Sequence, residues 1–504
     1  MARARKHVSD VFWRFVPVSI LVALVSYVVG KQVVEPHHRM IKVGLLLFVL
    51  VILIGFDTVY ALYFFIVLFP YPSGIVMTST NVILMTMIPL IWFVRARATG
   101  TRFFVRTEVD KWILVFILAY IVSLFNVDTT EDLVGGLNMV WRQVTAMALF
   151  YLLVTFVRDE SQLERITKVI ALSGALLALT GAVEVVSPGA TLIPGWITTA
   201  QQMGKETLGY RLEGIRVGGA AQSDGLLSDY CGLCLWLMVI HFLRAKHPFA
   251  RTFWLGISAV SLLVILATGN RGGVLSLGTA FAYSLWVFRR YMNPMRYVLL
   301  FCSVVVVFAT AQFLLEEYTI AVSVIDRLAE TRFKGLEPET RVGVWGPVFQ
   351  RSLDHIFIGH GPWYAPVRGV ARMFWPHNGY LFYLYTLGLF GLSVFLVIVY
   401  KLFRTSLRYA HPLASGTFLG TALSVFGVQL VQLVVAQMGT DHQRSTDFIY
   451  MYIIWLLFGL IAAAGNMVRQ REISAAGEPV LPDSSGTLTQ KPSRPKTGGG
   501  RGEG

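Results

Sequence analysis

The chain has 504 residues, of which 55% are hydrophobic and 14% are charged, and its mean hydropathy is +0.61. A soluble domain carries about 25% charged residues, so this composition excludes an ordinary soluble protein and predicts a polytopic membrane protein. The net charge of +14 does not indicate a nucleic-acid partner, because the basic residues cluster in short loops between apolar segments. Only three cysteines are present, which excludes a disulfide scaffold.

Apolar segments recur along the chain and are separated mostly by short loops. Each has about the length of a tilted or slightly short membrane helix, so we predict an all-α, polytopic transmembrane bundle of about 12–14 spans. The pair 41–56 and 58–70 could instead form one hairpin that does not cross fully, which keeps the span number even. The segments lie near residues 12–30, 41–56, 58–70, 80–94, 112–127, 137–157, 166–187, 228–243, 252–268, 273–288, 297–315, 378–400, 413–438 and 447–467.

The charges of the loops predict the orientation of the bundle. Alternate loops are basic, and basic loops stay in the cytoplasm. The opposite loops contain the acidic stretch Asp128–Asp132 and two long connections, near residues 188–227 and 316–377, which we expect on the periplasmic face. Both chain ends then lie in the cytoplasm. The basic loops hold Arg95, Arg97, Arg102, Arg106 and Lys111; Arg158 and Arg165; Arg244, Lys246 and Arg251; Arg289, Arg290 and Arg296; and Lys401, Arg404 and Arg408.

We expect residues 1–473 to form one transmembrane domain. From about Ser474 the chain is rich in Gly, Ser and Pro with scattered basic residues, which predicts a disordered cytoplasmic tail over residues 474–504. Cys231 and Cys234 form a CxxC pair, but they lie within an apolar helix with no thioredoxin-like unit around them. We therefore interpret both cysteines as core residues.

A polar, aromatic-rich run from Glu339 to Leu381 separates two very apolar blocks. Basic and histidine side chains are costly between membrane helices unless they have a function, so this run is the predicted site. After Pro338, apolar residues at helical spacing predict an amphipathic helix on the outer membrane surface. Arg341 begins that helix, where it either helps to bind an anion or is a solvated surface residue.

A glycine-rich turn from Ala267 to Gly273 lies on the outer face in this topology. Its glycines let the backbone approach a ligand, the next helix offers free N–H groups, and Arg271 adds a planar fork of donors suited to phosphate. The alternative is a helix cap whose arginine reaches the lipid headgroups. The turn is not a P-loop, which requires GxxxxGK[ST].

His377 and Asn378 stand where the polar run re-enters the membrane. A lone histidine beside an aromatic residue is usually structural, but this one shares an outer vestibule with the two arginines that favour anion binding. We therefore interpret His377 as a general base, with His355 and His360 as the alternatives. The other long outer loop adds two further basic contacts, Arg211 and Arg216.

Four short motifs occur in an order that resembles a known family. They are Asn270-Arg271-Gly272, Arg341 with Trp345, Gly359-His360-Gly361-Pro362, and His377-Asn378-Gly379-Tyr380-Leu381. Over about residues 210–400, their order, spacing and expected side of the membrane resemble the O-antigen ligase and polysaccharide polymerase superfamily of bacterial membrane glycosyltransferases. One departure is Asn270, where the family usually has Ser or Thr; it affects only the local hydrogen bonding.

The resemblance implies a metal-independent, inverting glycosyl transfer without a cofactor, at the periplasmic side of the bacterial cytoplasmic (inner) membrane. The donor is then an undecaprenyl diphosphate-linked glycan, and the acceptor is a lipid A–core sugar for a ligase or another lipid-linked glycan for a polymerase. The sequence leaves that choice open. The implied partners are membrane lipids and other polysaccharide-assembly proteins, with no nucleic acid. The implied roles are catalytic for His377, Arg271 and Arg341, and substrate-binding for Arg216, Arg211, Trp345, His360, Asn378 and Tyr380.

The chemistry of these residue types agrees with that reaction. No ATP is available outside the cell, so the energy must arrive with the donor. Cleavage of a sugar–diphosphate bond puts negative charge on the leaving group, which arginines stabilise. The acceptor hydroxyl is a weak nucleophile, and a positioned base such as His377 accelerates its attack by about 10²–10⁴.

Two other functions are compatible with this sequence. A lipid-linked oligosaccharide flippase would also have about 12–14 helices, but transporters usually show internal repeats and charged or broken helices near the midplane. A metal-dependent membrane glycosyltransferase would need an acidic pair in the first outer loop. That loop, residues 31–40, has only Glu35.

Overall fold

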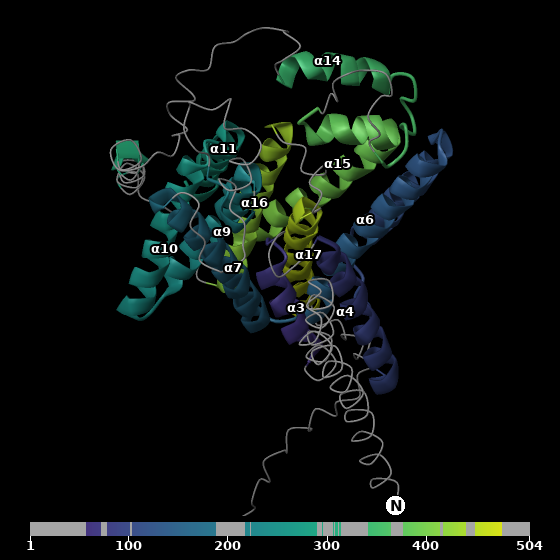
Figure 1. The fold of residues 1–504 in the computed structure, drawn as a ribbon. Helices are drawn as coiled ribbons and strands as arrows, with labels where there is room; N and C mark the ends of the chain where they lie inside the picture. The colour runs from purple at the N-terminus through teal and green to yellow at the C-terminus, as the bar shows by residue number, and fades with distance from the viewer. Residues whose placement is uncertain are drawn as a thin grey trace, which may run out of the picture.

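The computed structural model describes residues 57–71, 78–100, 103–187, 217–221, 223–289, 341–363, 376–413, 417–439 and 449–475, with a few single positions between 295 and 313. Within these ranges every regular element is a helix and no β-strand occurs. The helices, shown in Figure 1, are α3 (Thr58–Leu68), α4 (Thr78–Thr99), α5 (Asp110–Ser123), α6 (Thr130–Phe156), α7 (Glu160–Val186), α9 (Asp224–Arg244), α10 (Pro248–Ala267), α11 (Arg271–Phe288), α14 (Arg341–Ser352), α15 (Gly379–Leu413), α16 (Phe418–Gly439) and α17 (Ile449–Ala475), with 3-10 turns at Leu124–Asn126 and Gly219–Ala221.

Each predicted apolar segment that falls on described residues is a helix. Eight of the described helices are long and apolar enough to cross a membrane, which confirms an all-helical, multi-pass fold for this part of the chain. The predicted segments 12–30 and 41–56, and most of 297–315, lie outside the described residues. The total of about 12–14 spans and the cytoplasmic side of the two chain ends remain predictions.

Two boundaries differ from the sequence-based expectation. Helix α6 begins at Thr130, within the stretch expected to be an acidic outer loop, because Thr129 Oγ1 accepts a hydrogen bond from Asp132 N (3.1 Å) and caps the helix. The acidic Glu131 and Asp132 then lie in the first turn of the helix, where the helix dipole stabilises their negative charge. Helix α17 continues to Ala475, so the first residues of the predicted tail are helical; residues 476–504 lie outside the described ranges.

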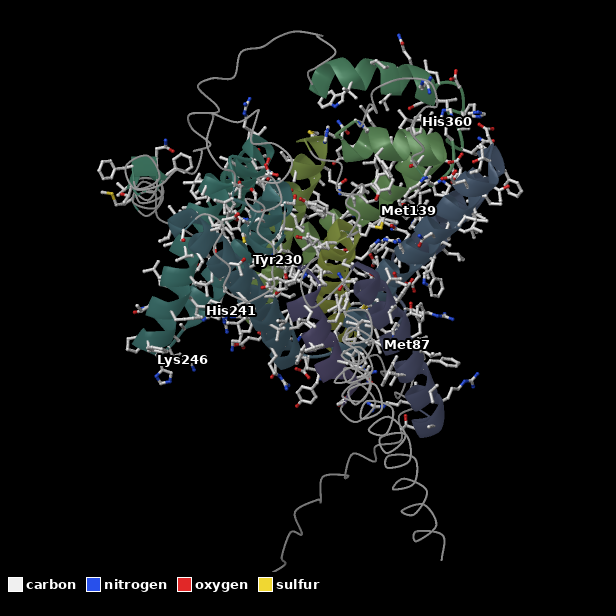
Figure 2. The ribbon with its side chains drawn as sticks, in the orientation of Figure 1. Met87, Met139, Tyr230, His241, Lys246 and His360 are labelled. Atoms are coloured by element: carbon white, nitrogen blue, oxygen red, sulfur yellow. The ribbon has the colours of Figure 1, made fainter. Side chains whose placement is uncertain are left out.

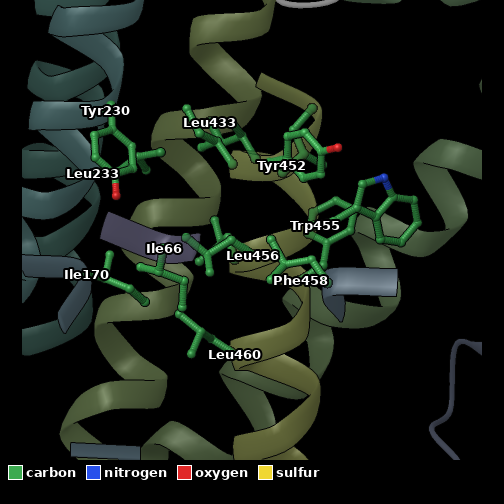
Figure 3. Packing of buried hydrophobic residues seen from close by; sticks show 14 of the residues in the cluster. Ile66, Ile170, Tyr230, Leu233, Leu433, Tyr452, Trp455, Leu456, Phe458 and Leu460 are labelled. Carbon is green, nitrogen blue, oxygen red and sulfur yellow. The ribbon is translucent and has the colours of Figure 1, made fainter. Parts of the chain in front are cut away.

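Helix α17 forms the centre of the bundle (Figure 1). Its most apolar stretch is 94% buried, more than that of the other described spans. Figure 3 shows its side chains pointing to both sides: Leu456 and Leu460 lie toward Ile170 of α7. On the other side the Trp455 ring packs edge-on against Phe150 of α6, with 6.0 Å between ring centroids. Most of the contacts of α17 are with α6, α15 and α16, so this helix is enclosed by its neighbours within the described part of the bundle.

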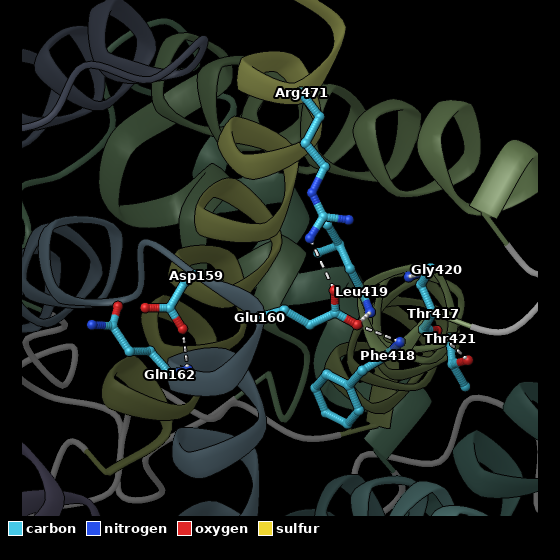
Figure 4. Close-up of polar contacts among 9 residues, drawn as sticks. All are labelled: Asp159, Glu160, Gln162, Thr417, Phe418, Leu419, Gly420, Thr421 and Arg471. Carbon is cyan, nitrogen blue, oxygen red and sulfur yellow. Dashed lines mark hydrogen bonds and ion pairs between the residues drawn. The ribbon is translucent and has the colours of Figure 1, made fainter. Parts of the chain in front are cut away.

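At one end of the bundle, Glu160 joins three helices (Figure 4). Its Oε1 accepts hydrogen bonds from Phe418 N (2.6 Å) and Leu419 N (3.2 Å), the first N–H groups of α16. Its Oε2 accepts from Arg471 Nη2 of α17 (2.9 Å). The carboxylate thus satisfies helix-end donors that would otherwise lack a partner, and it holds α7, α16 and α17 in register.

At the opposite end, helix α15 is broken at Gly388 and a loop is inserted into the break. Figure 2 shows His360 of this loop at the far end of the molecule from Lys246. Gly388 has a left-handed backbone (φ 66°, ψ −170°), so two helical hydrogen bonds are replaced by four bonds to the loop. They run from Leu389 N to Ile356 O (2.7 Å), Phe390 N to Phe357 O (3.1 Å), His360 N to Tyr385 O (2.9 Å) and Gly361 N to Thr386 O (3.2 Å).

Glycine is needed on both sides of this contact. A Cβ on Gly359 would lie 2.3 Å from the carbonyl of Thr386, and a Cβ on Gly388 would lie 2.3 Å from the carbonyl carbon of Phe357. The loop is also attached to the end of α5, because Asn126 Nδ2 donates to Gly359 O (2.7 Å). The first part of α15 consequently lies across the top of the bundle beneath α14 (Figure 1).

We predict that Gly359→Ala destabilises the folded protein. The new methyl group would meet backbone, which cannot move aside, at a position with φ 74°. A left-handed non-glycine residue alone costs about 1–3 kcal/mol. The measurement is thermal unfolding of the purified protein in detergent. Gly278→Ala is the matched control, because nothing lies within 4 Å of its Cβ position and alanine is the better helix former. Equal melting temperatures for both variants would contradict the packing described.

Candidate functional site

The turn Thr268–Gly273, called the Arg271 turn below, connects α10 to α11. Gly269 takes the left-handed conformation (φ 63°) that ends α10, and its N–H donates to Leu266 O (3.2 Å). Asn270 N donates to Thr268 Oγ1 (3.2 Å). Arg271 is then the first residue of α11 and is partly buried. Its guanidinium therefore starts from a helix N-terminus, where anions are favoured.

Asn270 does not use its side chain to cap α11. Its amide nitrogen is buried and has no hydrogen-bond partner among the residues that the structure describes. It is enclosed by glycines: the nitrogen would lie 3.1 Å from a Cβ on Gly273 and 3.8 Å from one on Gly225. The amide thus fills a space that exists because these residues lack side chains, and a donor remains unsatisfied there.

Polar side chains from α9 and α17 meet Asn270 of this turn; we call Ser228, Asp229, Asn270 and Tyr450 the polar cluster. All four side chains are buried. Tyr450 OH donates to Asp229 Oδ2 (3.3 Å), which links the start of α17 to α9. A Cβ on Gly273 would lie 2.0 Å from Ser228 Oγ, which has no hydrogen-bond partner within the described ranges. Buried polar groups in membrane helices are costly, so this cluster is a functional candidate.

The segment Val217–Ala221 lies against the same end of α10. Val217 N donates to Ala267 O (3.4 Å). The carboxylate of Glu184, on α7, accepts from Gly218 N (3.0 Å) and Gly219 N (2.6 Å). The end of the long loop before α9 is therefore fixed next to the Arg271 turn.

Residues Pro376–Tyr380 form a second feature, which we call the His377 corner. His377 has φ 45°, the only left-handed non-glycine backbone among the described residues. Such a conformation costs about 1–3 kcal/mol and is common at functional positions. Trp345 Nε1 of α14 donates to Pro376 O (2.6 Å). On the other side Asn378 Oδ1 caps α15 by accepting from Tyr380 N (3.0 Å) and Leu381 N (3.1 Å).

The end of α16 brings the two features together. Tyr380 OH donates to Val434 O (2.8 Å), and a Cβ on Gly379 would lie 2.2 Å from Gln437 Oε1. On the other side of the same helix end, a Cβ on Gly272 would lie 4.0 Å from Gly439 Cα. The Arg271 turn and the His377 corner therefore flank the last turns of α16.

Gln437 is an unusual residue at this junction. It is 1% exposed, and in the described part of the chain neither its Nε2 nor its Oε1 has a hydrogen-bond partner. A buried amide without partners costs about 1–3 kcal/mol per polar group. Its place beside the His377 corner makes it a candidate for positioning that corner.

His360 has a supporting place in the inserted loop. Its ring stacks on Tyr385, with 4.5 Å between centroids, and its Nε2 donates to Arg351 O (2.8 Å). Burial lowers the pKa of His360, so the neutral ring is favoured and Nε2 carries the proton that the carbonyl accepts. These contacts attach the end of α14 to α15. A substrate-binding role for His360 stays a prediction.

An apolar groove lies between α14 and the first part of α15. It has a volume of about 450 Å³ and ends at the His377 corner. Its lining is mostly aliphatic and aromatic, which suits a flexible hydrocarbon chain. The lining residues are Trp345, Gly346, Phe349, Asn378, Tyr380, Leu381, Leu384 and Leu392.

The other predicted site residues are only partly within the described ranges. Arg341 begins α14, one turn before Trp345, but its side chain lies outside the described part, as do Arg211 and Arg216. The sequence analysis missed Ser228, Asp229, Gln437 and Tyr450. Asp229 carried a signal, since an acidic residue within a predicted span is a functional candidate by default. Among the described residues, no three His, Cys, Asp or Glu side chains gather closely enough to hold a metal ion.

Residues 256–396 match the family model described as O-antigen ligase. This confirms the resemblance inferred from the motifs, for the stretch that runs from α10 to the second part of α15. The stretch contains the Arg271 turn and the His377 corner but not α9, α16 or α17. A search of curated proteins found no match to the chain. Together with the eight apolar helices, the family match supports a membrane enzyme of glycan transfer.

We predict that Trp345→Phe loosens the His377 corner. Phenylalanine keeps the ring in the apolar groove but cannot donate to Pro376 O. One such bond contributes about 0.5–1.5 kcal/mol, so amide exchange of residues 377–381 should accelerate by about 2- to 10-fold. Hydrogen–deuterium exchange with mass spectrometry measures this. Phe349→Leu, one turn further along α14, is the control and should leave the rate unchanged. Equal protection in the Trp345 variant would remove this bond as a determinant of the corner.

Proposed function

We propose that this protein transfers a glycan from a polyprenyl diphosphate, undecaprenyl diphosphate in bacteria, to a hydroxyl acceptor on the periplasmic face of the cytoplasmic membrane. The observation that most supports the proposal is that the Arg271 turn and the His377 corner pack against the same end of α16. One feature offers groups for an anionic leaving group. The other offers a base for an incoming hydroxyl.

The donor is held at its diphosphate. Arg271 extends from the first residue of α11, where the helix dipole also favours negative charge. Arg341 begins α14, whose second and third turns line the apolar groove through Trp345, Gly346 and Phe349. The prenyl chain then lies along that groove. When the C1–O bond to the diphosphate breaks, both electrons go to the phosphate oxygen, and the arginines stabilise that charge.

The acceptor is activated on the opposite side of the sugar. Its hydroxyl oxygen attacks C1 with inversion while its proton passes to the imidazole of His377. The left-handed backbone of His377 and the two bonds of Asn378 to α15 hold the backbone from which that ring extends. A second lipid-linked glycan as acceptor would make the protein a polymerase, and a lipid A–core sugar would make it a ligase. We favour the polymerase, because the basic tail is suited to cytoplasmic assembly partners.

We predict that Arg271→Ala lowers transfer by about 10²–10³ without preventing membrane insertion, because it removes a donor aimed at the charge that develops on the leaving group. Arg271→Lys should restore only part of the rate, since an ammonium lacks the bidentate fork. The assay is transfer from purified lipid-linked glycan. Arg251→Ala is the matched control: Arg251 is exposed at the other end of the bundle, over the Phe242 ring. Full activity of Arg271→Ala would remove the turn from the phosphate site.

We predict that His377→Asn lowers turnover by about 10²–10⁴ and leaves donor binding nearly unchanged. Asparagine tolerates the left-handed backbone, so the corner should keep its shape while the base is lost. Turnover and donor binding are measured on the same purified variant. His355→Asn, at an exposed position of the inserted loop, should have a mild effect. Loss of donor binding in the His377 variant would assign this residue to the phosphate site instead, and normal turnover would exclude it from the reaction.

A further inference from the structure

A cationic cavity lies at the end of the bundle remote from the Arg271 turn. It is formed where α5 begins and α15 ends, and its volume is about 410 Å³. The cavity lies at the start of α5. Asn126, which follows the other end of this helix, binds the inserted loop, so the length of α5 lies between the cavity and that loop. Its lining residues are Glu108, Lys111, Tyr400, Lys401, Arg404, Thr405, Arg408 and Tyr409.

The cavity has a large excess of positive charge. Four cationic side chains line it, Lys111 from α5 and Lys401, Arg404 and Arg408 from α15. Its one acidic lining residue, Glu108, forms an ion pair with Arg469 of α17 and so does not neutralise them. Cations that converge from two helices on one hollow repel each other unless an anion lies between them.

The position of the cavity is that of a lipid headgroup. The uncharged stretch of α15 ends at Tyr400, and the three cations follow in the last turns of this helix. Basic residues directly after an apolar span are expected at the membrane–water boundary. Tyr400 is 62% exposed beside them, as expected of a tyrosine in the interfacial belt. Basic pockets between helices on the cytoplasmic side bind phosphate headgroups of anionic lipids.

Orientation signalling alone does not account for this arrangement. Arg97 and Arg251 are also among the basic residues that predict the orientation, but they do not line the cavity. Stacking on an aromatic ring does not separate the two groups, because Lys111 and Arg408 of the cavity also lie over rings. A topology signal requires charge near the end of a span, not charges gathered around a hollow. The cavity therefore needs a ligand with negative charge and access from the bilayer.

We propose that this cavity binds the phosphate headgroup of an anionic phospholipid in the leaflet opposite the candidate glycan-transfer site. Arg404 and Arg408 bind phosphate oxygens from α15, and Lys111 contacts them from α5. Tyr400 faces the acyl chains. The bound lipid bridges α5 and α15, the two helices that also hold the inserted loop at their other ends. This site does not depend on the reaction that the protein catalyses.

The test uses the full-length protein in neutral detergent, with native mass spectrometry to count bound lipids. The probes are cardiolipin and phosphatidylglycerol, with phosphatidylcholine as the zwitterionic comparison. Two variants that each remove two charges are compared: Arg404→Gln with Arg408→Gln, and Arg97→Gln with Arg251→Gln. A third variant, Lys111→Gln, alters the other wall of the cavity, so the test does not depend on α15 tolerating two substitutions.

We expect anionic lipid to bind the wild type and the Arg97/Arg251 variant equally. Each cation removed from the cavity should weaken binding about 5-fold, hence about 25-fold for the Arg404/Arg408 variant and about 5-fold for Lys111→Gln. Equal loss in both double variants would show non-specific charge attraction and overturn the proposal, as would equal binding of phosphatidylcholine. Displacement by inorganic phosphate at the concentration of the lipid would assign the cavity to a soluble anion instead.

Discussion

The arrangement of the candidate site depends on the hydrogen bonds between the loop Ile356–Gly361 and the break in α15 at Gly388. A continuous helix would need no partner at Gly388, but the break frees donors and acceptors that must be satisfied in a water-poor environment. The residues from Ile356 to Gly361 satisfy four of them. Because the same loop is bonded to Asn126, it connects α5, α14 and α15 and lets the first part of α15 lie across the bundle. The His377 corner is at the start of that part.

The site is consequently built from helix ends, not from a soluble domain. Gly272 and Gly379 allow α11 and α15 to approach the last turns of α16 closely. Gln437 is buried there without a hydrogen-bond partner among the described residues. Ser228 and Asn270 also have unsatisfied polar atoms at the Arg271 turn. Polar groups of this kind are usually paired in a folded protein. These unsatisfied groups gather at one end of the bundle, near His377 with its left-handed backbone. A charged, hydroxyl-rich substrate bound there would supply the hydrogen-bond partners that they lack.

The helices could be predicted from the sequence because apolar segments of this length permit few structures in a membrane, and the amphipathic α14 followed from the spacing of its apolar residues. The break of α15 could not, since Gly388 stands in an apolar stretch that is indistinguishable from a continuous span. The contacts of Gln437 and Tyr450 join segments far apart in the chain, which no local pattern indicates. The motifs with Arg271 and His377 were found by resemblance, and their meeting at α16 required the fold.

The central claim is that the Arg271 turn and the His377 corner contact one substrate. The most direct measurement is photo-crosslinking of the purified protein with a polyprenyl diphosphate-linked glycan that carries a photoreactive group on its first sugar, followed by peptide mapping. We expect labelled peptides from both the start of α11 and residues 376–381, and competition by unlabelled donor. Labelling that avoids both segments, or that is confined to the opposite end near Lys401 and Arg408, would contradict it.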